Sequence, residues 1–401
     1  MRAVPADALA HRLATNPILT SADVAPSQAA LEVVSVFNAA AAQVGKETIL
    51  LLRVGEYPRR MTGLMSPTAR TLDLAAPHEA LQPLPPGTLG EDVIGIAYLD
   101  PATEPQRVVV AYVRKDLPGL DLSDPRAVRV TVPPAKPGGR AEVRDYLTQI
   151  SHLRVARSTD GAHFVVDPLP AVVPIDSFEE YGCEDPRATM IDNAWHITYV
   201  SVGSVGITTS RLTTTDFKAF ERRGLMFLPD HKDVALFPGR VRGRYVALTR
   251  PMPSSFNRVL GIWIAFSDDL VGWGAHRPLA LPRRGMWDSV RTGAGAVPFR
   301  VPEGWLELYH GVNSDGHYAM GGLLLDAEDP ARVIGRSPEP ILTATEEYER
   351  SGFYNNTVFS CGVVPLDERG ERIRMYYGAA DCRMAAADFD VRAIVASLAP
   401  C

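Results

Sequence analysis

The fold of this chain is indicated by three strings that share one pattern: Ser158-Thr-Asp160-Gly-Ala-His-Phe164, Thr214-Thr-Asp216-Phe-Lys-Ala-Phe220 and Ser267-Asp-Asp269-Leu-Val-Gly-Trp273. Each string has a hydroxyl residue two positions before an aspartate and an aromatic residue four positions after it. Because each follows an apolar stretch typical of a strand, each predicts a hairpin turn whose aspartate accepts backbone N–H groups. The aspartates are 56 and 53 positions apart, which indicates repeated small sheets.

A second recurring strand lies between these turns. Its copies are ETILLLRV (47–54), AWHITYV (194–200), RYVALTR (244–250), WLELYHGV (305–312) and IRMYYGAAD (373–381). Five such units predict an all-β fold in which small antiparallel sheets repeat radially around a channel, a five-bladed β-propeller. The alternative is a β-sandwich whose strands resemble one another by chance.

Two stretches depart from this repeat. Residues 28–42 have the clearest helical periodicity of the chain, although this run could also straddle a strand. Residues 71–142 are loaded with proline and break the period, so we expect an insertion that decorates the first blade. The whole chain, 1–401, is then a single domain, and the sequence assigns no function to the insertion.

The composition excludes several classes of protein. A net charge of -6 gives no basic surface for nucleic acid. The four cysteines lack CxxC spacing, which argues against a disulfide framework or a structural zinc site, and no apolar run approaches the ~20 residues of a membrane helix. We therefore expect a soluble, cytoplasmic protein without a metal, a nucleic-acid partner or a membrane partner. Assembly into a homo-oligomer stays open.

Polar residues gather at the ends of the recurring strands, where a propeller would bring them into one pocket. The densest cluster is Glu184-Asp185-Pro186-Arg187, in which a proline limits the freedom of two carboxylates and an arginine. Cleavage of a glycosidic bond needs a carboxylic acid that protonates the leaving oxygen, so this cluster is a candidate for that acid. A surface turn stabilised by an ion pair is the simpler alternative.

The chain resembles glycoside hydrolase family 130 in an ordered series of strings: Tyr181-Gly-Cys-Glu-Asp-Pro-Arg-Ala-Thr-Met-Ile-Asp192, His231-Lys-Asp-Val-Ala-Leu-Phe-Pro238, Arg250-Pro251, Trp305-Leu-Glu-Leu-Tyr-His-Gly-Val312 and Tyr376-Tyr-Gly-Ala-Ala-Asp381. The resemblance extends from about Asn16 to Asp381, with the proline-rich stretch as the main departure. Members of that family are five-bladed propellers that act on β-mannosides. Most are phosphorylases that release mannose 1-phosphate, and a minority are hydrolases.

The resemblance implies that Asp185 is the general acid and passes its proton through a mannose hydroxyl to the glycosidic oxygen. It places Lys232, Arg250, Arg291 and His310 in the set that binds inorganic phosphate, the co-substrate, and it implies no cofactor. Arginine forks onto phosphate oxygens and lysine adds a compact charge, which fits this role. Alternatively, either arginine pairs with a neighbouring carboxylate, and His310 is a satisfied core residue.

The remaining polar candidates would bind sugar hydroxyls: Asn38, Arg53, Asp145, Arg187, Asp233 and Asp381. The segment 144–153 resembles members that act on β-1,2-linked mannosides, so the expected reaction is inverting phosphorolysis of such mannosides to α-mannose 1-phosphate. One alternative is an inverting β-1,2-mannosidase in which an acid such as Asp288 or Glu307 activates water. Another is a propeller that binds carbohydrate without catalysis.

Overall fold

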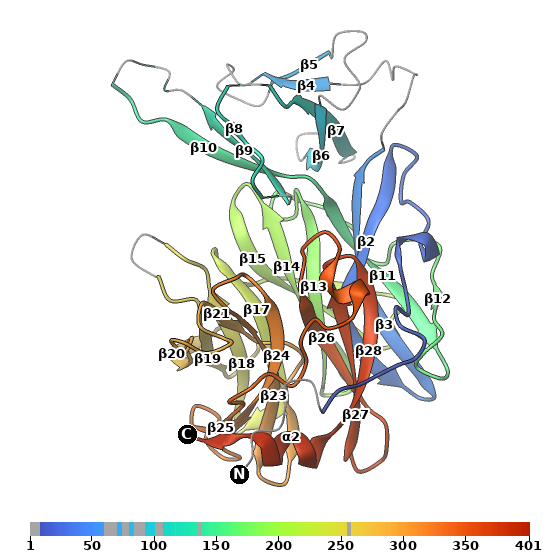
Figure 1. Cartoon of the computed structure of the whole chain (residues 1–401), viewed down its shortest axis with the longest axis vertical. Coiled ribbons are helices and arrows are strands. Elements are labelled where there is room, and N and C mark those ends of the chain that lie inside the picture. The colour runs from blue at the N-terminus through green and yellow to red at the C-terminus, as the bar shows by residue number, and fades with distance from the viewer. Residues whose placement is uncertain are drawn as a thin grey trace.

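The computed structural model describes residues 9–59, 70–73, 80–83, 93–100 and 107–401, except 117, 125, 133, 135, 137 and 255–257. Strands dominate these residues (Figure 1). The described helices are the 3-10 turn η1 (Ser21–Asp23), α1 (Glu347–Arg350) and α2 (Val391–Ser397). The predicted all-β class is confirmed.

The largest sheet has eight strands, of which seven form the path β16-β15-β14-β13-β11-β3-β2 and β12 pairs with β11. Their bounds are β2 (Leu31–Val44), β3 (Glu47–Pro58), β11 (Ile150–Ser158), β12 (Val165–Val166), β13 (Gly182–Ile191), β14 (Ala194–Gly203), β15 (Gly206–Thr214) and β16 (Glu221–Phe227). Its two halves are antiparallel and meet through one parallel pair, Ser151 with Gly182.

Three further sheets follow along the chain. One contains β17 (His231–Val241), β18 (Arg244–Pro251), β19 (Ile262–Ser267) and β20 (Gly274–Ala280) in that order. The next contains β21 (Arg291–Gly293), β22 (Phe299–Val301), β23 (Gly304–Val312), β24 (Tyr318–Leu325), β25 (Val333–Arg336) and β29 (Ala399–Pro400). The last contains β26 (Val358–Pro365), β27 (Arg372–Ala379) and β28 (Arg383–Asp390), and the early strand β1 (His11–Arg12) pairs with β28.

The helical interpretation of residues 28–42 is wrong and the strand alternative is confirmed, because residues 31–42 belong to β2. Ala39 and Ala41 pack into one hydrophobic cluster, while Ala40 and Ala42 pack into another. A strand buried on both faces has no polar alternation, and its tertiary contacts override the helix propensity of alanine.

The three repeated turns have the geometry that their pattern predicts. The hydroxyl residue accepts the N–H three positions later, at 2.9 Å from Gly161, 3.0 Å from Phe217 and 2.9 Å from Leu270. The Oδ1 atom of each aspartate accepts the N–H groups two and three positions after it. Each turn joins the last two strands of an antiparallel series, β11 to β12, β15 to β16 and β19 to β20.

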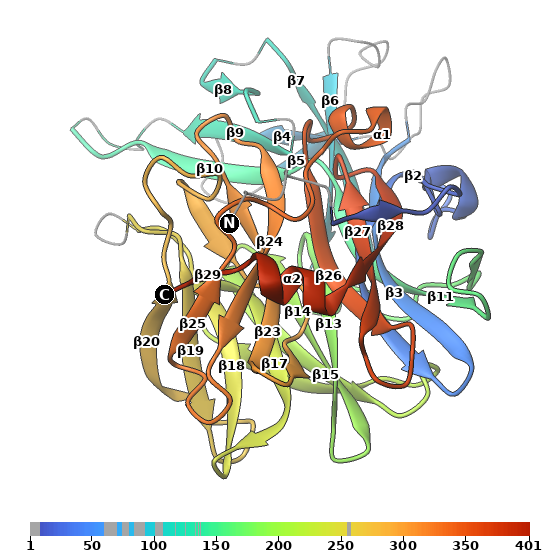
Figure 2. The ribbon, with the colours of Figure 1, turned by 60° about the horizontal axis from the view of Figure 1, so that its bottom comes forward.

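Hydrophobic clusters fill the spaces between the sheets. Helix α2 illustrates this packing, since Ile394 joins Leu308, Met320 and Phe389 in one cluster that links two sheets. Figure 2 shows α2 lying across the near end of these sheets.

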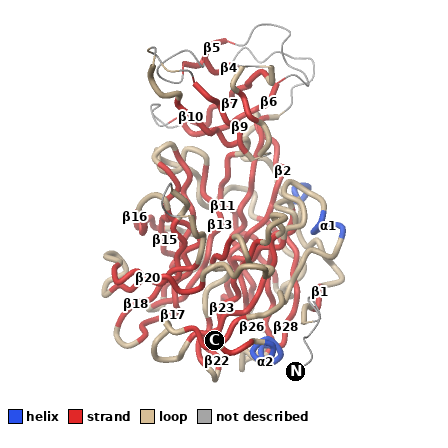
Figure 3. Tube along the Cα trace, turned by 60° about the vertical axis from the view of Figure 1, so that its left-hand side comes forward, coloured by secondary structure: helices blue, strands red, loops and turns tan. Residues whose placement is uncertain are grey.

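The segment between β3 and β11 forms two sheets of its own, β5-β4-β7-β6 and β10-β9-β8. The strands are β4 (Arg70–Asp73), β5 (Ala80–Pro83), β6 (Val93–Asp100), β7 (Arg107–Arg114), β8 (Leu120–Asp121), β9 (Ala127–Val132) and β10 (Glu142–Leu147). They stand at one end of the molecule (Figure 3). This segment contains the proline-rich stretch 71–142, part of which lies outside the described residues.

Candidate active site

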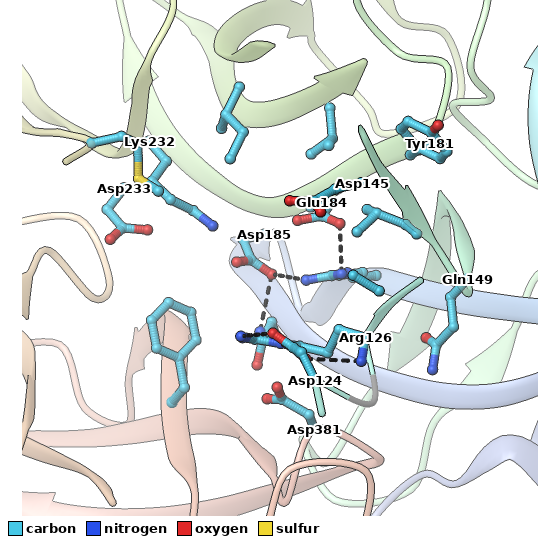
Figure 4. A pocket seen from close by; sticks show the side chains of 18 of the residues that line it. Asp124, Arg126, Asp145, Gln149, Tyr181, Glu184, Asp185, Lys232, Asp233 and Asp381 are labelled. Atoms are coloured by element: carbon cyan, nitrogen blue, oxygen red, sulfur yellow. Dashed lines mark hydrogen bonds and ion pairs between the residues drawn. The ribbon is translucent and has the colours of Figure 1, made fainter. Parts of the chain in front are cut away.

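A cavity of about 680 Å³ opens between the β-sheets and the segment of β8 to β10 (Figure 4). This volume suits a small ligand, since such sites measure roughly 300–1,000 Å³. The cavity brings together most of the residues expected at the site: Asn38, Arg53, Asp145, Asp185, Lys232, Asp233, Arg250, Arg291, His310 and Asp381.

Three of these side chains lie at breaks in strand pairing. The register of β2 shifts between Phe37 and Ala40, that of β13 between Glu184 and Arg187, and that of β17 between Lys232 and Ala235. Each break contains a residue with positive φ, at 49° for Asn38, 45° for Asp185 and 55° for Asp233. Such a bulge redirects one side chain out of the strand's alternation, and it therefore sets the side chains that reach the cavity.

Asp185 is buried among cationic and amide groups. Its Oδ1 accepts hydrogen bonds from Asn38 Nδ2 at 2.9 Å and Arg53 Nη1 at 3.0 Å, while Arg53 Nη2 pairs with Glu184 at 2.7 Å. Burial raises the pKa of the Asp185 carboxyl, but Arg53 and Lys232 outweigh this effect and hold the pKa below its ordinary value. Within the described residues Oδ2 makes no hydrogen bond, so it is the oxygen left for a ligand.

Asp233 is the anion at the centre of the basic residues. Arg250 Nε donates to its Oδ2 at 2.7 Å, and His310 Nε2 and Arg187 Nη2 each lie 3.6 Å from the carboxylate. Burial raises the pKa of Asp233, yet the neighbouring basic groups, Arg250 first among them, hold it well below its ordinary value. Burial lowers the pKa of His310 to about 3, so this imidazole is neutral at neutral pH. Burial likewise lowers the pKa of Lys232.

Several buried nitrogens around the cavity have no hydrogen-bond partner within the described residues. They are Arg250 Nη1, Arg291 Nε and His310 Nδ1. The other end of Arg291 donates to the Tyr318 hydroxyl, and the Tyr318 ring stacks on His310 at 5.8 Å between centroids. Buried nitrogens without partners are costly, and an anion bound among them would satisfy them.

Two of the expected sugar ligands lie differently from the others. Arg187 does not line the cavity, because it is buried beneath it and donates to the carbonyl oxygens of Ala294, Gly295 and Asp185. Asp145 lies in the exposed part of the lining, where both of its oxygens accept from Arg129 at 2.7 and 2.8 Å.

Asp381 comes from the loop after β27 and has a φ of 51°. Burial raises its pKa to about 6 against the attraction of Arg53, and the charge of Asp185 adds to the increase. Because it titrates below neutrality, it is ionised in a neutral solution.

The lining also contains residues that the sequence analysis missed, above all from the segment of β8 to β10. Asp124 pairs with Arg126 at 2.8 Å, and the Arg126 guanidinium lies 5.0 Å from the centre of the Tyr354 ring. One signal was available, because the string Asp124-Pro-Arg-Ala127 repeats the string Asp185-Pro-Arg-Ala188.

Within the described residues, no group of three or more His, Cys, Asp or Glu side chains is placed to hold a metal ion. None of the helices in this part of the chain is long and apolar enough to cross a membrane.

A model of glycoside hydrolase family 130, described as β-1,4-mannooligosaccharide phosphorylase, matches residues 140–399. The chain belongs to glycoside hydrolase family 130. A family 130 relative from Listeria innocua, named β-1,2-mannobiose phosphorylase, is 36% identical over 97% of this chain and 98% of its own. A 1,2-β-oligomannan phosphorylase from Thermoanaerobacter is 36% identical over 62% of this chain and 82% of its own.

A solved structure from the same family also superposes on nearly the whole chain. The Listeria innocua β-1,2-mannobiose phosphorylase in its β-1,2-mannobiose complex gives a TM-score of 0.83 at 34% identity, over 97% of this chain and 98% of that one. The expected family membership is therefore confirmed.

Proposed function

We propose that this chain cleaves β-1,2-linked mannosides by inverting phosphorolysis and releases α-mannose 1-phosphate. One observation carries the proposal: the Asp185 carboxyl shares a cavity with basic groups, three of which have buried nitrogens that find no partner among the described residues. The Listeria innocua relative, similar over almost its full length, acts on β-1,2-mannobiose by its name, and this supports the linkage.

In the proposed reaction a phosphate oxygen forms a bond to the anomeric carbon while the glycosidic C–O bond breaks on the opposite face. Asp185 Oδ2 gives a proton to a mannose hydroxyl, whose own proton passes to the glycosidic oxygen. The phosphate is held by Lys232, Arg250, Arg291 and His310. Phosphate thus replaces the second carboxylate that an inverting hydrolase requires.

Asp185 must be protonated when the substrate is bound, although the cations that line the cavity favour its ionised form. A phosphate anion beside Lys232 opposes the positive potential at Asp185 and so raises the pKa of its carboxyl. Figure 4 shows the Lys232 amine on the side of the cavity toward Asp185. Phosphate is then the nucleophile and also the group that keeps the Asp185 carboxyl protonated.

We also propose that the sheets are the blades of a five-bladed propeller in a single domain, with the segment 71–142 decorating the first blade. The eight-stranded sheet would divide into two blades at the single parallel pair Ser151–Gly182, and β21 with β22 would form one interrupted inner strand. The pairing of β1 with β28 supports this architecture, since it joins the two ends of the series.

For the sugar we assign Asn38, Arg53 and Asp381 to hydroxyl contacts and Asp145 to the outer part of the cavity. Arg187 donates to backbone carbonyl groups and Asp233 accepts from Arg250, so we assign both residues to holding the site in shape.

A β-mannosidase is the second candidate, because a carboxylate already lies beside Arg250 and His310. Asp233 would then activate water in place of phosphate. A general base works best with a pKa near the working pH, whereas the Asp233 pKa lies well below its ordinary value. This favours the phosphorylase.

The two candidates are separated by incubating the protein with β-1,2-mannobiose or β-1,4-mannobiose, with and without phosphate. We expect mannose 1-phosphate from the β-1,2-linked sugar and only when phosphate is present. Release of free mannose at the same rate without phosphate would establish the hydrolase instead.

A further inference from the structure

The innermost strand of the β21 to β25 sheet is interrupted. β21 pairs with β23 as far as Gly293 with His310, and β22 resumes at Phe299 with Leu306. Between these pairs the carbonyl groups of Ala294 and Gly295 leave the ladder. They accept hydrogen bonds from the buried Arg187, at 2.8 Å from Nη2 and 2.6 Å from Nε.

Glu307 supplies the hydrogen bond that the ladder lacks here. This fully buried side chain of β23 accepts the Gly295 N–H on Oε1 at 2.8 Å, and its Oε2 has no partner within the described residues. Gly295 has no room to move, since an added Cβ would collide with the Leu308 carbonyl oxygen. The carboxyl therefore fixes the peptide whose oxygen Arg187 binds.

Arg187 connects the fixed Gly295 peptide to the candidate acid. Its Nη1 donates to the backbone oxygen of Asp185 at 3.1 Å, within the register break that gives Asp185 its positive φ. A run of buried hydrogen bonds thus leads from Glu307 through Gly295 and Arg187 to Asp185. Glu307, Gly295 and Arg187 do not line the cavity, so they contact no ligand there.

We propose that Glu307 is a positioning residue that holds the Asp185 turn in its proton-donating geometry through Gly295 and Arg187. This inference rests on the proposed function of Asp185 as the general acid. A misplacement of a few tenths of an ångström at a proton donor slows proton transfer and has little effect on sugar binding.

The ionisation of Glu307 should make the rate of proton transfer depend on pH. Burial raises its pKa to about 8, against the Gly295 hydrogen bond and the attraction of Arg187, which is the charged group that faces it. Glu307 is therefore neutral at pH 7. Above about pH 8 its new charge draws Arg187 away from the Asp185 carbonyl, so the proton-transfer step slows as the pH rises.

Two variants test the inference. Glu307→Leu removes the acceptor of the Gly295 N–H at similar volume, and we expect kcat on β-1,2-mannobiose to fall about ten-fold while KM changes little. Glu307→Gln keeps an acceptor but cannot ionise, so we expect it to restore most of the lost rate. It should also lack the part of the wild-type decline that begins near pH 8 and keep only the decline caused by deprotonation of Asp185. Glu303→Gln, an exposed carboxyl just before β23, is the matched control and should behave as wild type.

A β-mannosyl fluoride separates positioning from general damage, because fluoride leaves without a proton. We expect Glu307→Leu to turn over this fluoride at the wild-type rate. An equal loss on both substrates, or wild-type rates on both, would overturn the inference. If Glu307→Leu does not fold, a pH profile of Glu307→Gln that coincides with that of the wild type would overturn it as well. Wild-type protein that forms no mannose 1-phosphate would instead refute the proposed function, and the role of Glu307 would fall with it.

Discussion

Aspartates serve two regions of this molecule in opposite ways. In the hairpin turns, Asp216 and its two counterparts are exposed and accept N–H groups two and three positions later, which lowers their pKa. In the strand breaks, Asp185 and Asp233 are buried, have positive φ, and are paired with arginines of other strands. The turn aspartate is satisfied by its own segment, whereas the cavity aspartate depends on the assembled sheets.

An aspartate carboxylate therefore contributes to local stability or to chemistry according to whether its partners are neighbours in sequence or lie on other strands. The hydrogen bonds of a turn join residues two and three positions apart, so none of them involves the cavity. The ionisation of Asp185, by contrast, depends on Arg53 from β3 and Lys232 from β17, so its properties arise only in the folded chain. The comparison predicts that substitutions in the two regions affect different measurements.

The largest effect is expected at the candidate acid. Asp185→Asn keeps the shape of the side chain but removes the proton donor, so turnover of β-1,2-mannobiose should fall by about 10²–10⁴-fold while sugar binding persists. Steady-state kinetics with calorimetric titration of the sugar would measure both quantities. Asp216→Asn, in a turn, is the control and should keep its kcat. Undiminished turnover by Asp185→Asn would remove Asp185 from the mechanism.

An intermediate effect is expected for phosphate. Arg291→Ala removes a guanidinium whose described partner is the neutral Tyr318 hydroxyl, so no carboxylate is left unpaired, as it would be for Asp233 if Arg250 were changed. We expect the phosphate KM to rise about ten- to a hundredfold and the mannoside KM to change far less. Arg277→Ala, at an exposed position of β20, is the control. Equal increases in both KM values would contradict a phosphate site at Arg291.

The smallest effect on activity is expected at the turns. Asp216→Ala removes the acceptor of two backbone N–H groups, so the melting temperature should fall while kcat/KM stays at the wild-type value. The folded pKa of Asp216 is lowered, so its stabilisation is present above the unfolded pKa and is lost as the pH falls through the folded pKa. The difference in stability between variant and wild type should therefore shrink in acid. A loss of kcat/KM with an unchanged melting temperature would contradict the claim that the turn aspartates serve stability and the cavity aspartates serve catalysis.

The sequence predicts the turns well because their hydrogen bonds join residues within a few positions. The all-β class follows from the same turns and from the recurring strands. The run of alanines in β2 was misleading, because only the completed sheets show that both of its faces are buried. Helix propensity is a local property, and burial on two faces is not.

The residues of the site could be collected from the sequence, but their roles could not. Arg187 and Asp185 are two positions apart, yet one lies beneath the cavity and the other lines it, because the register break between them reverses the alternation of the strand. Arg126, which lines the cavity, was missed because it lies in the segment that lacks the repeated strands and turns. Which carboxylate stays neutral is likewise invisible in sequence, because Glu307 owes its raised pKa to burial.

The segment between β3 and β11 begins and returns beside one uninterrupted ladder, in which Glu56 pairs with Ile150 and Thr48 with Ser158. Its two ends are therefore held together by the sheet itself, and its length does not have to match any span elsewhere in the chain. The segment should therefore be replaceable: a short hairpin loop that joins β3 directly to β11 should preserve the fold. Such a graft would remove Asp124 and Arg126 from the cavity wall, and it would make the outer half of the site a separately replaceable part.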